Sequence, residues 1–145
     1  MKLEFDNSIG FLVHDVARLM RLNFDRKSQN TGLTRAQWSV LVYLRRSDGA
    51  QQNTVAQLME IAPITLARHV DRLEAEGWVE RREDPDDRRA KRVFLTAKAT
   101  PMLKTLRGLG QKVRKQALKG ISPSEEEQML AILSRIRENL SENGN

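Results

Sequence analysis

The chain of 145 residues contains no cysteine, which excludes disulfide bonds, thiolate metal sites and a thiol-based redox switch. Its two histidines, His14 and His69, do not make a metal site on their own. No apolar run approaches the roughly 20 residues that a membrane-spanning helix needs, and the N-terminus lacks the apolar run of a signal peptide. We therefore expect a cytoplasmic protein without a cofactor, a metal or a membrane partner, built as one domain or as one core with terminal helices.

Acidic residues are absent between residues 97 and 121, where the chain carries seven basic ones. The whole chain has a formal net charge of +6, which favours a polyanionic partner but does not locate its binding surface. Residues 63–96 show why, because eight basic residues there are balanced by eight acidic ones. A nucleic-acid surface in that segment therefore depends on the helix face or hairpin position that each arginine occupies.

Residues from Pro63 onward follow an amphipathic helical pattern, and proline suits the first turn of a helix. One face is apolar and is expected to be buried; it consists of Leu66, Val70 and Leu73. An adjacent face, roughly 100° away, carries hydrogen-bond donors: Thr65, Arg68, His69 and Arg72. A helix that enters the major groove of DNA needs such a face. An ordinary charged surface helix is the alternative.

Gly77 is the expected C-cap of this helix. The segment after it predicts a β-hairpin, because short runs with β-branched and aromatic residues flank the turn sequence Asp84-Pro85-Asp86-Asp87. Basic residues gather around its tip: Arg88, Arg89, Lys91 and Arg92. A helix-turn-helix that is followed by a basic hairpin is a winged helix.

The run DPDDRRAKRVFLT, residues 84–96, resembles the wing signature of the MarR family of transcriptional regulators, and its DDRRAKR form is most similar to the SlyA-type branch. The resemblance implies a bacterial regulator that binds a palindromic operator in double-stranded DNA as a homodimer. It also implies a cytoplasmic location, on the nucleoid when the protein is bound to DNA. It implies DNA contacts from the recognition helix and the wing: Pro63, Thr65, Arg68, His69, Arg72, Arg88 and Arg89. Arg68 is the expected base contact, and Arg88 is expected in the adjacent minor groove.

Acidic residues of the predicted wing are expected to act within the protein, because a bare carboxylate near phosphates is repelled. Asp84 is expected to orient the wing arginine. Arg89, Lys91 and Arg92 either contact phosphate or pair with Asp86 and Asp87, and surface pairs of that kind contribute little stability.

The resemblance also implies a small-molecule effector, a phenol or an aromatic carboxylate, bound in a cleft between the dimer helices and the winged helix. The residues expected to line it are His14, Arg18, Trp38 and Val42. Arg18 would pair with a carboxylate and Trp38 would stack on a ring. For Trp38 the alternative is a place in the hydrophobic core.

Apolar residues at helical spacing predict further helices on both sides of this segment. They are expected over residues 6–28, from Thr34 to about Ser47, from Asn53 or Thr54 to about Glu60, from Thr96 to about Lys119, and from Ser122 onward. Asn53 or Thr54 is the expected N-cap of the third of these helices, and Thr96 is the expected N-cap of the fourth. Thr34 with Gln37 forms a capping box, and Ser122 with Pro123 and Glu125 is a further helix start. Ala50–Gln52 is expected to form a short edge strand against the wing.

The predicted fold is mainly α with a small β-wing: a winged helix-turn-helix DNA-binding domain at 34–96, an N-terminal helix in 1–33 and C-terminal helices in 97–145. The flanking helices have long apolar faces that a monomer would struggle to cover, so we expect them to form a twofold homodimer. Packing of these helices on the central domain is the alternative.

Enzymatic functions find little support in the sequence. Gly108-Leu109-Gly110 does not follow a strand and is not a dinucleotide-binding loop, and no serine or histidine has an evident activating partner. We therefore expect no enzyme. The alternative function is a winged-helix module that binds protein or RNA without binding an operator, because the fold serves those roles too.

Overall fold

A computed structural model describes residues 8–142. Its elements, in chain order, are α1 (Ile9–Ser28), the 3-10 turn η2 (Gln29–Thr31), α2 (Arg35–Arg46), α3 (Gln52–Met59), α4 (Pro63–Ala75), β1 (Val79–Asp84), β2 (Asp87–Leu95), α5 (Ala99–Ala117) and α6 (Pro123–Glu142). The mainly helical fold with a small two-stranded wing agrees with the prediction. In the described part of the chain, no helix is long and apolar enough to cross a membrane.

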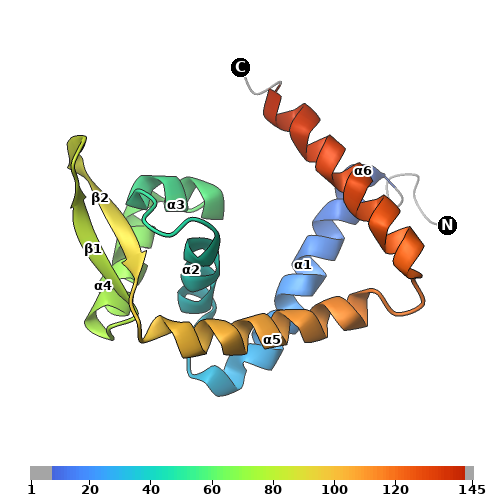
Figure 1. The fold of residues 1–145 in the computed structure, drawn as a ribbon, viewed down its shortest axis with the longest axis horizontal. Helices are drawn as coiled ribbons and strands as arrows, with labels where there is room; N and C mark the ends of the chain where they lie inside the picture. The colour runs from blue at the N-terminus through green and yellow to red at the C-terminus, as the bar shows by residue number, and fades with distance from the viewer. Residues whose placement is uncertain (1–7, 143–145) are drawn as a thin grey trace.

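Two groups of elements are joined by α5, as Figure 1 shows. The helices α2, α3 and α4 and the hairpin of β1 and β2 lie together at one end, and the hairpin forms the outer edge. The helix α5 runs from this group towards α1 and α6, and α1 packs against α5. The first group therefore has the arrangement of a winged helix, and α5 connects it to the terminal helices.

The hydrophobic core of the winged helix includes the predicted inner face of α4, because Leu66, Val70 and Leu73 are fully buried. The side chains that surround this face come from α2, α3, the wing and α5: Val40, Leu41, Leu44, Val55, Val79, Val93 and Leu106. Burying one such side chain stabilises the fold by about 1.5–3 kcal/mol. The core thereby fixes which face of α4 is left for solvent.

Two helix starts follow the predicted capping chemistry. At α2 the Gln37 backbone N–H donates to the Thr34 hydroxyl at 3.2 Å, and the Thr34 N–H donates to the Gln37 side-chain oxygen at 3.0 Å. At α6 the Ser122 hydroxyl and the Glu125 carboxylate make the same reciprocal pair at 3.1 and 3.0 Å. These caps use residues three apart, so local sequence is sufficient to specify them.

Two other predicted caps are wrong. The helix α3 begins at Gln52 with Gln51 as its N-cap, rather than being capped by Asn53 or Thr54, because Gln51 is held by a backbone bridge to Arg92 of the wing. The predicted edge strand at residues 50–52 is reduced to this one bridge. Beside it, the Val93 N–H donates a hydrogen bond to the Ala50 carbonyl at 2.9 Å.

Thr96 does not cap α5, which begins at Ala99. Its hydroxyl donates instead to the carbonyl oxygens of Gly77 at 2.6 Å and Trp78 at 3.1 Å. The hydroxyl thus ties the exit of β2 to the entry of β1 and is not free to cap a helix. At the N-terminus, α1 begins at Ile9 with Ser8 as its N-cap, and the predicted start at Asp6 lies outside the described residues.

The end of α4 depends on Gly77, as predicted. Gly77 has φ of 81°, a left-handed conformation that glycine adopts without a steric penalty. Its N–H donates to the Glu74 carbonyl at 3.0 Å, and the Trp78 N–H donates to the Leu73 carbonyl at 2.9 Å. This Schellman arrangement stops the helix and directs the chain into β1.

Candidate nucleic-acid interface

The solvent face of α4 carries the polar side chains that the sequence predicts. Thr65, Arg68 and Arg72 are exposed and His69 is half-buried, whereas the apolar face lies in the core. Within residues 8–142, the side chains of Arg68 and Arg72 have no hydrogen-bond or ion-pair partner. Two guanidinium groups are therefore held on one helix with all of their donors available.

The turn between α3 and α4 fixes where α4 begins. Glu60 has φ of 55°, and the Ile61 N–H donates to the Ala56 carbonyl at 3.1 Å. A non-glycine residue in this conformation costs roughly 1 kcal/mol, so the surrounding structure must hold it. Pro63 then occupies the first turn of α4, and Pro63 and Thr65 are both exposed at the N-terminal end of the helix.

The wing contains a register shift that places two arginines outside its ladder. Residue Glu83 lies opposite Lys91, but the next residue, Asp84, lies opposite Asp87. Residues 88–90 of β2 consequently have no partner on β1, and a bulge of this kind redirects the side chains that it carries. Arg88 and Arg89 are exposed there, and their guanidinium groups have no hydrogen-bond or ion-pair partner among residues 8–142.

Asp84 holds the base of this tip. One carboxylate oxygen accepts hydrogen bonds from Gln51 Nε2 at 2.8 Å and Arg92 Nε at 3.0 Å, and the other accepts from the Asp86 N–H at 2.9 Å. The Asp86 backbone bond, followed by the Gln51 bond and the Arg92 guanidinium, lowers the pKa of Asp84 below its ordinary value. The arginine that Asp84 holds is therefore Arg92, not Arg88, and the carboxylate joins the wing to α3.

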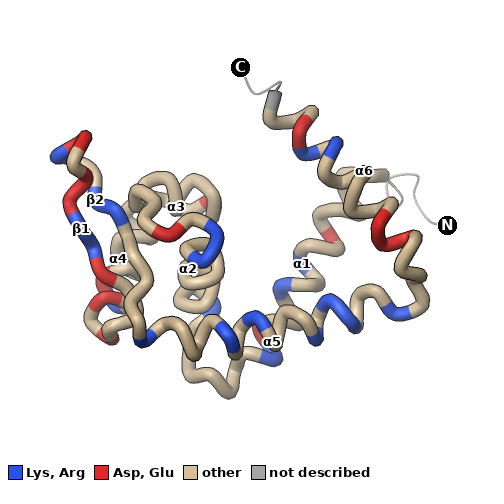
Figure 2. Tube along the Cα trace, viewed as in Figure 1, with Lys and Arg blue, Asp and Glu red and all other residues tan. Residues whose placement is uncertain are grey.

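The remaining basic residues of the hairpin are neutralised within the protein. β1 carries both acidic and basic residues, whereas on β2 the one acidic residue, Asp87, lies at the tip and basic residues follow it (Figure 2). Lys91 pairs with Glu83 at 3.6 Å, which the ladder places opposite it. Arg92 lies opposite Arg82 and pairs with Asp84, two residues further along β1, at 3.0 Å. The alternative in which Lys91 and Arg92 pair with Asp86 and Asp87 is therefore wrong.

Arg81 is an important residue that the sequence analysis missed. Its guanidinium donates to Asp71 Oδ1 at 2.6 Å, to the Ala67 carbonyl at 2.9 Å and to Gln52 Oε1 at 3.0 Å, and its backbone N–H donates to Glu74 Oε2 at 2.7 Å. Arg81 thus fastens α4 to the wing and to α3. The spacing of Asp71 and Glu74, three residues apart on α4, was the available signal for an acidic patch facing the hairpin.

The four residues predicted to line an effector cleft do not meet in one cavity. Trp38 is 7% exposed, its ring lies 4.4 Å from that of Phe24, and its Nε1 donates to Asp25 Oδ1 at 3.1 Å. Trp38 therefore occupies the core, as the alternative interpretation holds. His14 and Arg18 lie on the exposed surface of α1, where Arg18 is 3.7 Å from Asp15.

Val42 does line a cavity, of about 240 Å³, where α1, α2 and α5 meet. Apolar and basic side chains both line it; the lining residues are Phe24, Val42, Arg45, Leu106, Arg107, Gly110, Gln111 and Arg114. Arg45 and Arg107 have no acidic partner among the described residues. This cavity could hold an apolar ring with an anionic substituent.

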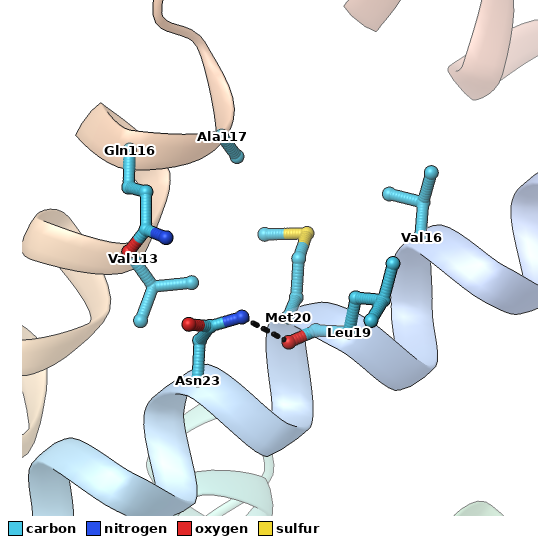
Figure 3. Close-up of a pocket in the computed structure, with 7 residues that line it drawn as sticks. All are labelled: Val16, Leu19, Met20, Asn23, Val113, Gln116 and Ala117. Atoms are coloured by element: carbon cyan, nitrogen blue, oxygen red, sulfur yellow. Dashed lines mark hydrogen bonds between the residues drawn. The ribbon is translucent and has the colours of Figure 1, made fainter.

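A second cleft, of about 270 Å³, separates α1 from the C-terminal half of α5 (Figure 3). The side chains that line it are Val16, Leu19, Met20, Asn23, Val113, Gln116 and Ala117. Asn23 turns its amide back to the Leu19 carbonyl at 2.8 Å, and none of the lining residues is charged. The cleft suits apolar side chains rather than a nucleic acid.

Comparison with known proteins places these features in a family. The family model described as MarR family matches residues 31–90. The solved structure of the transcriptional regulator PA3341 is 36% identical, with a TM-score of 0.81 over 94% of this chain and 100% of that one. A MarR transcriptional regulator from Methanosarcina mazei Go1 is 26% identical, with a TM-score of 0.80 over 90% and 94% of the two chains. The transcriptional regulator SlyA is 29% identical, with a TM-score of 0.77 over 94% and 96%.

Proposed function

Since the chain belongs to the MarR family of transcriptional regulators, we propose that it binds a palindromic operator in double-stranded DNA as a homodimer. Regulators of this family bind DNA and are not enzymes, so no catalytic role is assigned. The observation that carries the proposal is the division among the arginines of α4 and the wing. Arg81, Arg82 and Arg92 are engaged by carboxylates, whereas four others have no partner among residues 8–142: Arg68, Arg72, Arg88 and Arg89.

Each free side chain has a role that its position supports. Arg68 faces solvent near the middle of α4, and a guanidinium there can bind O6 and N7 of guanine in the major groove. Pro63, Thr65, His69 and Arg72 surround Arg68 on the same helix and would position it against base edges and phosphates. Arg88, carried by the bulge, would enter the adjacent minor groove, and Arg89 would contact phosphate.

The dimer is supported by apolar side chains that the single chain leaves exposed on α1 and α6. On α1 they are Ile9, Phe11, Leu12, Val13, Val16, Leu19 and Met20; on α6 they are Leu130, Ile132, Leu133 and Leu140. No residue of α6 whose burial is described is buried. Exposed apolar surface of this extent marks an interaction site, and a twofold dimer is the commonest solution.

This arrangement suggests which parts of the chain bind DNA and which form the dimer. Residues 34–96 would form the DNA-binding domain, and residues 1–33 and 97–145 would supply the dimerisation helices. One winged helix binds one half-site, so the dimer would bind two half-sites about one helical turn of DNA apart. We assign the chain to the SlyA-type branch because of its wing sequence, residues 84–96. We also propose that it acts in the bacterial cytoplasm, bound to the nucleoid.

A small aromatic or phenolic effector is part of the proposal. The cavity beside Val42 supports it, because Phe24 and Leu106 offer apolar side chains while Arg45 and Arg107 can bind a carboxylate. The cavity lies between α1, α2 and α5, so a ligand there would alter how α5 connects the terminal helices to the winged helix. Titration with benzoate tests this point: the operator complex should weaken in the parent protein and should not weaken when Arg107→Ala removes the anchor.

Selection of bound fragments from a genomic duplex library tests the proposed function. The protein should enrich one family of palindromic sequences, and its affinity should fall steeply as salt rises, because bound arginines release counterions from the phosphates. If no duplex is preferred over random sequence, operator binding is excluded, and a module that binds protein or RNA becomes the better interpretation.

A further inference from the structure

The exposed large apolar side chains of the described chain fall into two groups. Nearly all lie on α1, on α6 or at Ile121 between α5 and α6, where the proposed dimer would cover them. Only Leu58 and Ile64 belong to the winged helix. Leu58 is 48% exposed and lies beside Tyr43, Arg46 and Ser47, whereas Ile64 is 65% exposed. Dimerisation through the terminal helices therefore gives no reason for an isoleucine at position 64.

Ile64 occupies the first turn of α4, directly after Pro63 and before Thr65. The N-terminal residues of a recognition helix are the ones that contact base edges. Ile64 also precedes Arg68 by four residues and Arg72 by eight, so these three side chains share one stripe along the helix. The most exposed apolar residue of the winged helix thus lies in line with the two unpartnered guanidinium groups of α4.

The chemistry of the major groove offers one apolar group to such a side chain. Guanine, cytosine and adenine present hydrogen-bond donors and acceptors there, and thymine alone adds a C5-methyl group. Isoleucine cannot form a hydrogen bond, and its β-branched side chain is stiff in a helix. We propose that Ile64 contacts the C5-methyl group of a thymine in each half-site and makes that base pair a determinant of sequence preference.

This inference rests on the proposed function and specifies part of it. A separation of four residues along α4 corresponds to roughly 6 Å, and successive base pairs are about 3.4 Å apart. The thymine should therefore lie within about two base pairs of the guanine that Arg68 contacts. The position is fixed by the helix and not by the identity of the operator.

The test uses deoxyuridine, which lacks only the methyl group of thymine. In the operator that the genomic selection yields, each thymine of one half-site is replaced in turn, and the affinities of the parent and Ile64→Ala proteins are measured. The affinity of the parent protein should fall about fourfold when one particular thymine is replaced, because burial of one apolar carbon contributes a free energy of that size. Ile64→Ala should bind the unmodified operator more weakly by a similar factor and should be indifferent to the replacement at that position. Leu58→Ala, the matched control, should keep the full sensitivity.

The outcomes separate the two proposals. If no operator is enriched, the proposed function fails before Ile64 is tested. If an operator is enriched but no thymine is sensitive, or if Ile64→Ala keeps the sensitivity of the parent, the thymine contact is refuted while operator binding stands. Thermal unfolding of Ile64→Ala should match that of the parent. Should it not, Ile64→Ser, which has no methyl group, undergoes the same measurement: indifference to the replacement supports the contact, and retained sensitivity refutes it.

Discussion

Arg81 Nη2 lies 2.6 Å from Asp71 Oδ1, and this contact joins the wing to the middle of α4. The same guanidinium reaches the Ala67 carbonyl, one turn earlier on α4, and Gln52 on α3. Arg81 is therefore occupied entirely by the protein, although it belongs to the same basic hairpin as Arg88. The two arginines should consequently respond in opposite ways to stability and DNA-binding measurements.

Arg81→Ala should destabilise the fold by about 1–2 kcal/mol, because it removes several hydrogen bonds from a largely buried side chain. Asp71 is 62% exposed, so solvent screening limits what the ion pair itself contributes. For a chain of this size the unfolding midpoint should fall by roughly 3–6 °C. Arg89→Ala, which removes a side chain without a partner among residues 8–142, is the control and should leave the midpoint nearly unchanged. Equal unfolding midpoints for the two variants would contradict the stabilising role of the Arg81 contacts.

Arg68→Ala should show the reverse pattern. The free energy of unfolding should change by less than about 0.5 kcal/mol, because the side chain is exposed and has no partner in the described chain. Binding to the operator should weaken by about 1–3 kcal/mol, and the preference should relax at one position in each half-site. A repeated selection with the variant measures this directly. Unchanged preference at every position would remove Arg68 as a base contact.

Arg82→Ala is the matched control for that measurement. Arg82 lies on β1 of the same wing, pairs with Glu80 and stacks 4.1 Å above the Phe94 ring. Its loss should reduce DNA affinity little and should leave the preference intact. A loss as large as that of Arg68→Ala would mean that the removed charge matters and its position does not.

Leu12→Glu on α1 and Leu133→Glu on α6 should each convert the dimer to monomers. Both side chains are exposed in the single chain, so the charge should not disturb the fold of the monomer, but it would be buried at a dimer interface. Sedimentation velocity should show half the parent mass, and affinity for the palindrome should fall with it. Leu58→Glu, on an exposed site of the winged helix, should remain dimeric. Dimers that persist in both terminal variants would place the interface elsewhere.

The stability of the wing should depend on pH through Asp84. Its pKa in the folded protein is lowered from the ordinary 3.8, chiefly by the Asp86 N–H and then by Gln51 and Arg92. A carboxylate with a lowered folded pKa contributes stability above the unfolded pKa and loses it as pH falls through the folded value. The free energy of unfolding should therefore decline as pH drops below about 3.8.

Urea unfolding of the parent and Asp84→Asn proteins at neutral and acidic pH measures this contribution. The difference between the two proteins should be large near neutral pH and should shrink towards pH 3 and below. Asp15→Asn, at a half-exposed position of α1 away from the wing, controls for the loss of one negative charge. A difference between parent and Asp84→Asn that does not vary with pH would show that ionised Asp84 does not stabilise the wing.

Features that depend on neighbouring residues could be predicted from the sequence. The stop at Gly77 and the caps at Thr34 and Ser122 arise from contacts within a few positions of the chain, and the buried face of α4 follows from the helical spacing of its own apolar residues. Their geometry is set by helical periodicity and by backbone donors that need partners. The same local logic identified the hairpin, because its turn sequence lies between two strand-like runs.

Features that depend on distant residues could not be predicted. Gln51 and Asp84 are 33 positions apart, and only the folded wing shows that their side chains meet. Thr96 has the composition of an N-cap, but its hydroxyl is taken by carbonyls 18 and 19 positions earlier. Trp38 suited both a ligand site and the core, and its contact with Phe24 favours the core. Whether an arginine is free or paired likewise depended on the strand register.

The proposal that unpartnered arginines of a dimer bind an operator can be decided by one ratio of affinities. The dissociation constant for the selected palindrome is compared, at fixed salt, with that for a duplex whose half-sites are scrambled. The parent should prefer the palindrome by roughly a thousandfold or more, and the combined variant Arg68→Ala, Arg72→Ala, Arg88→Ala should lose most of that preference while remaining a folded dimer. A parent protein that binds both duplexes equally, or a combined variant that retains the full preference, would contradict the proposal.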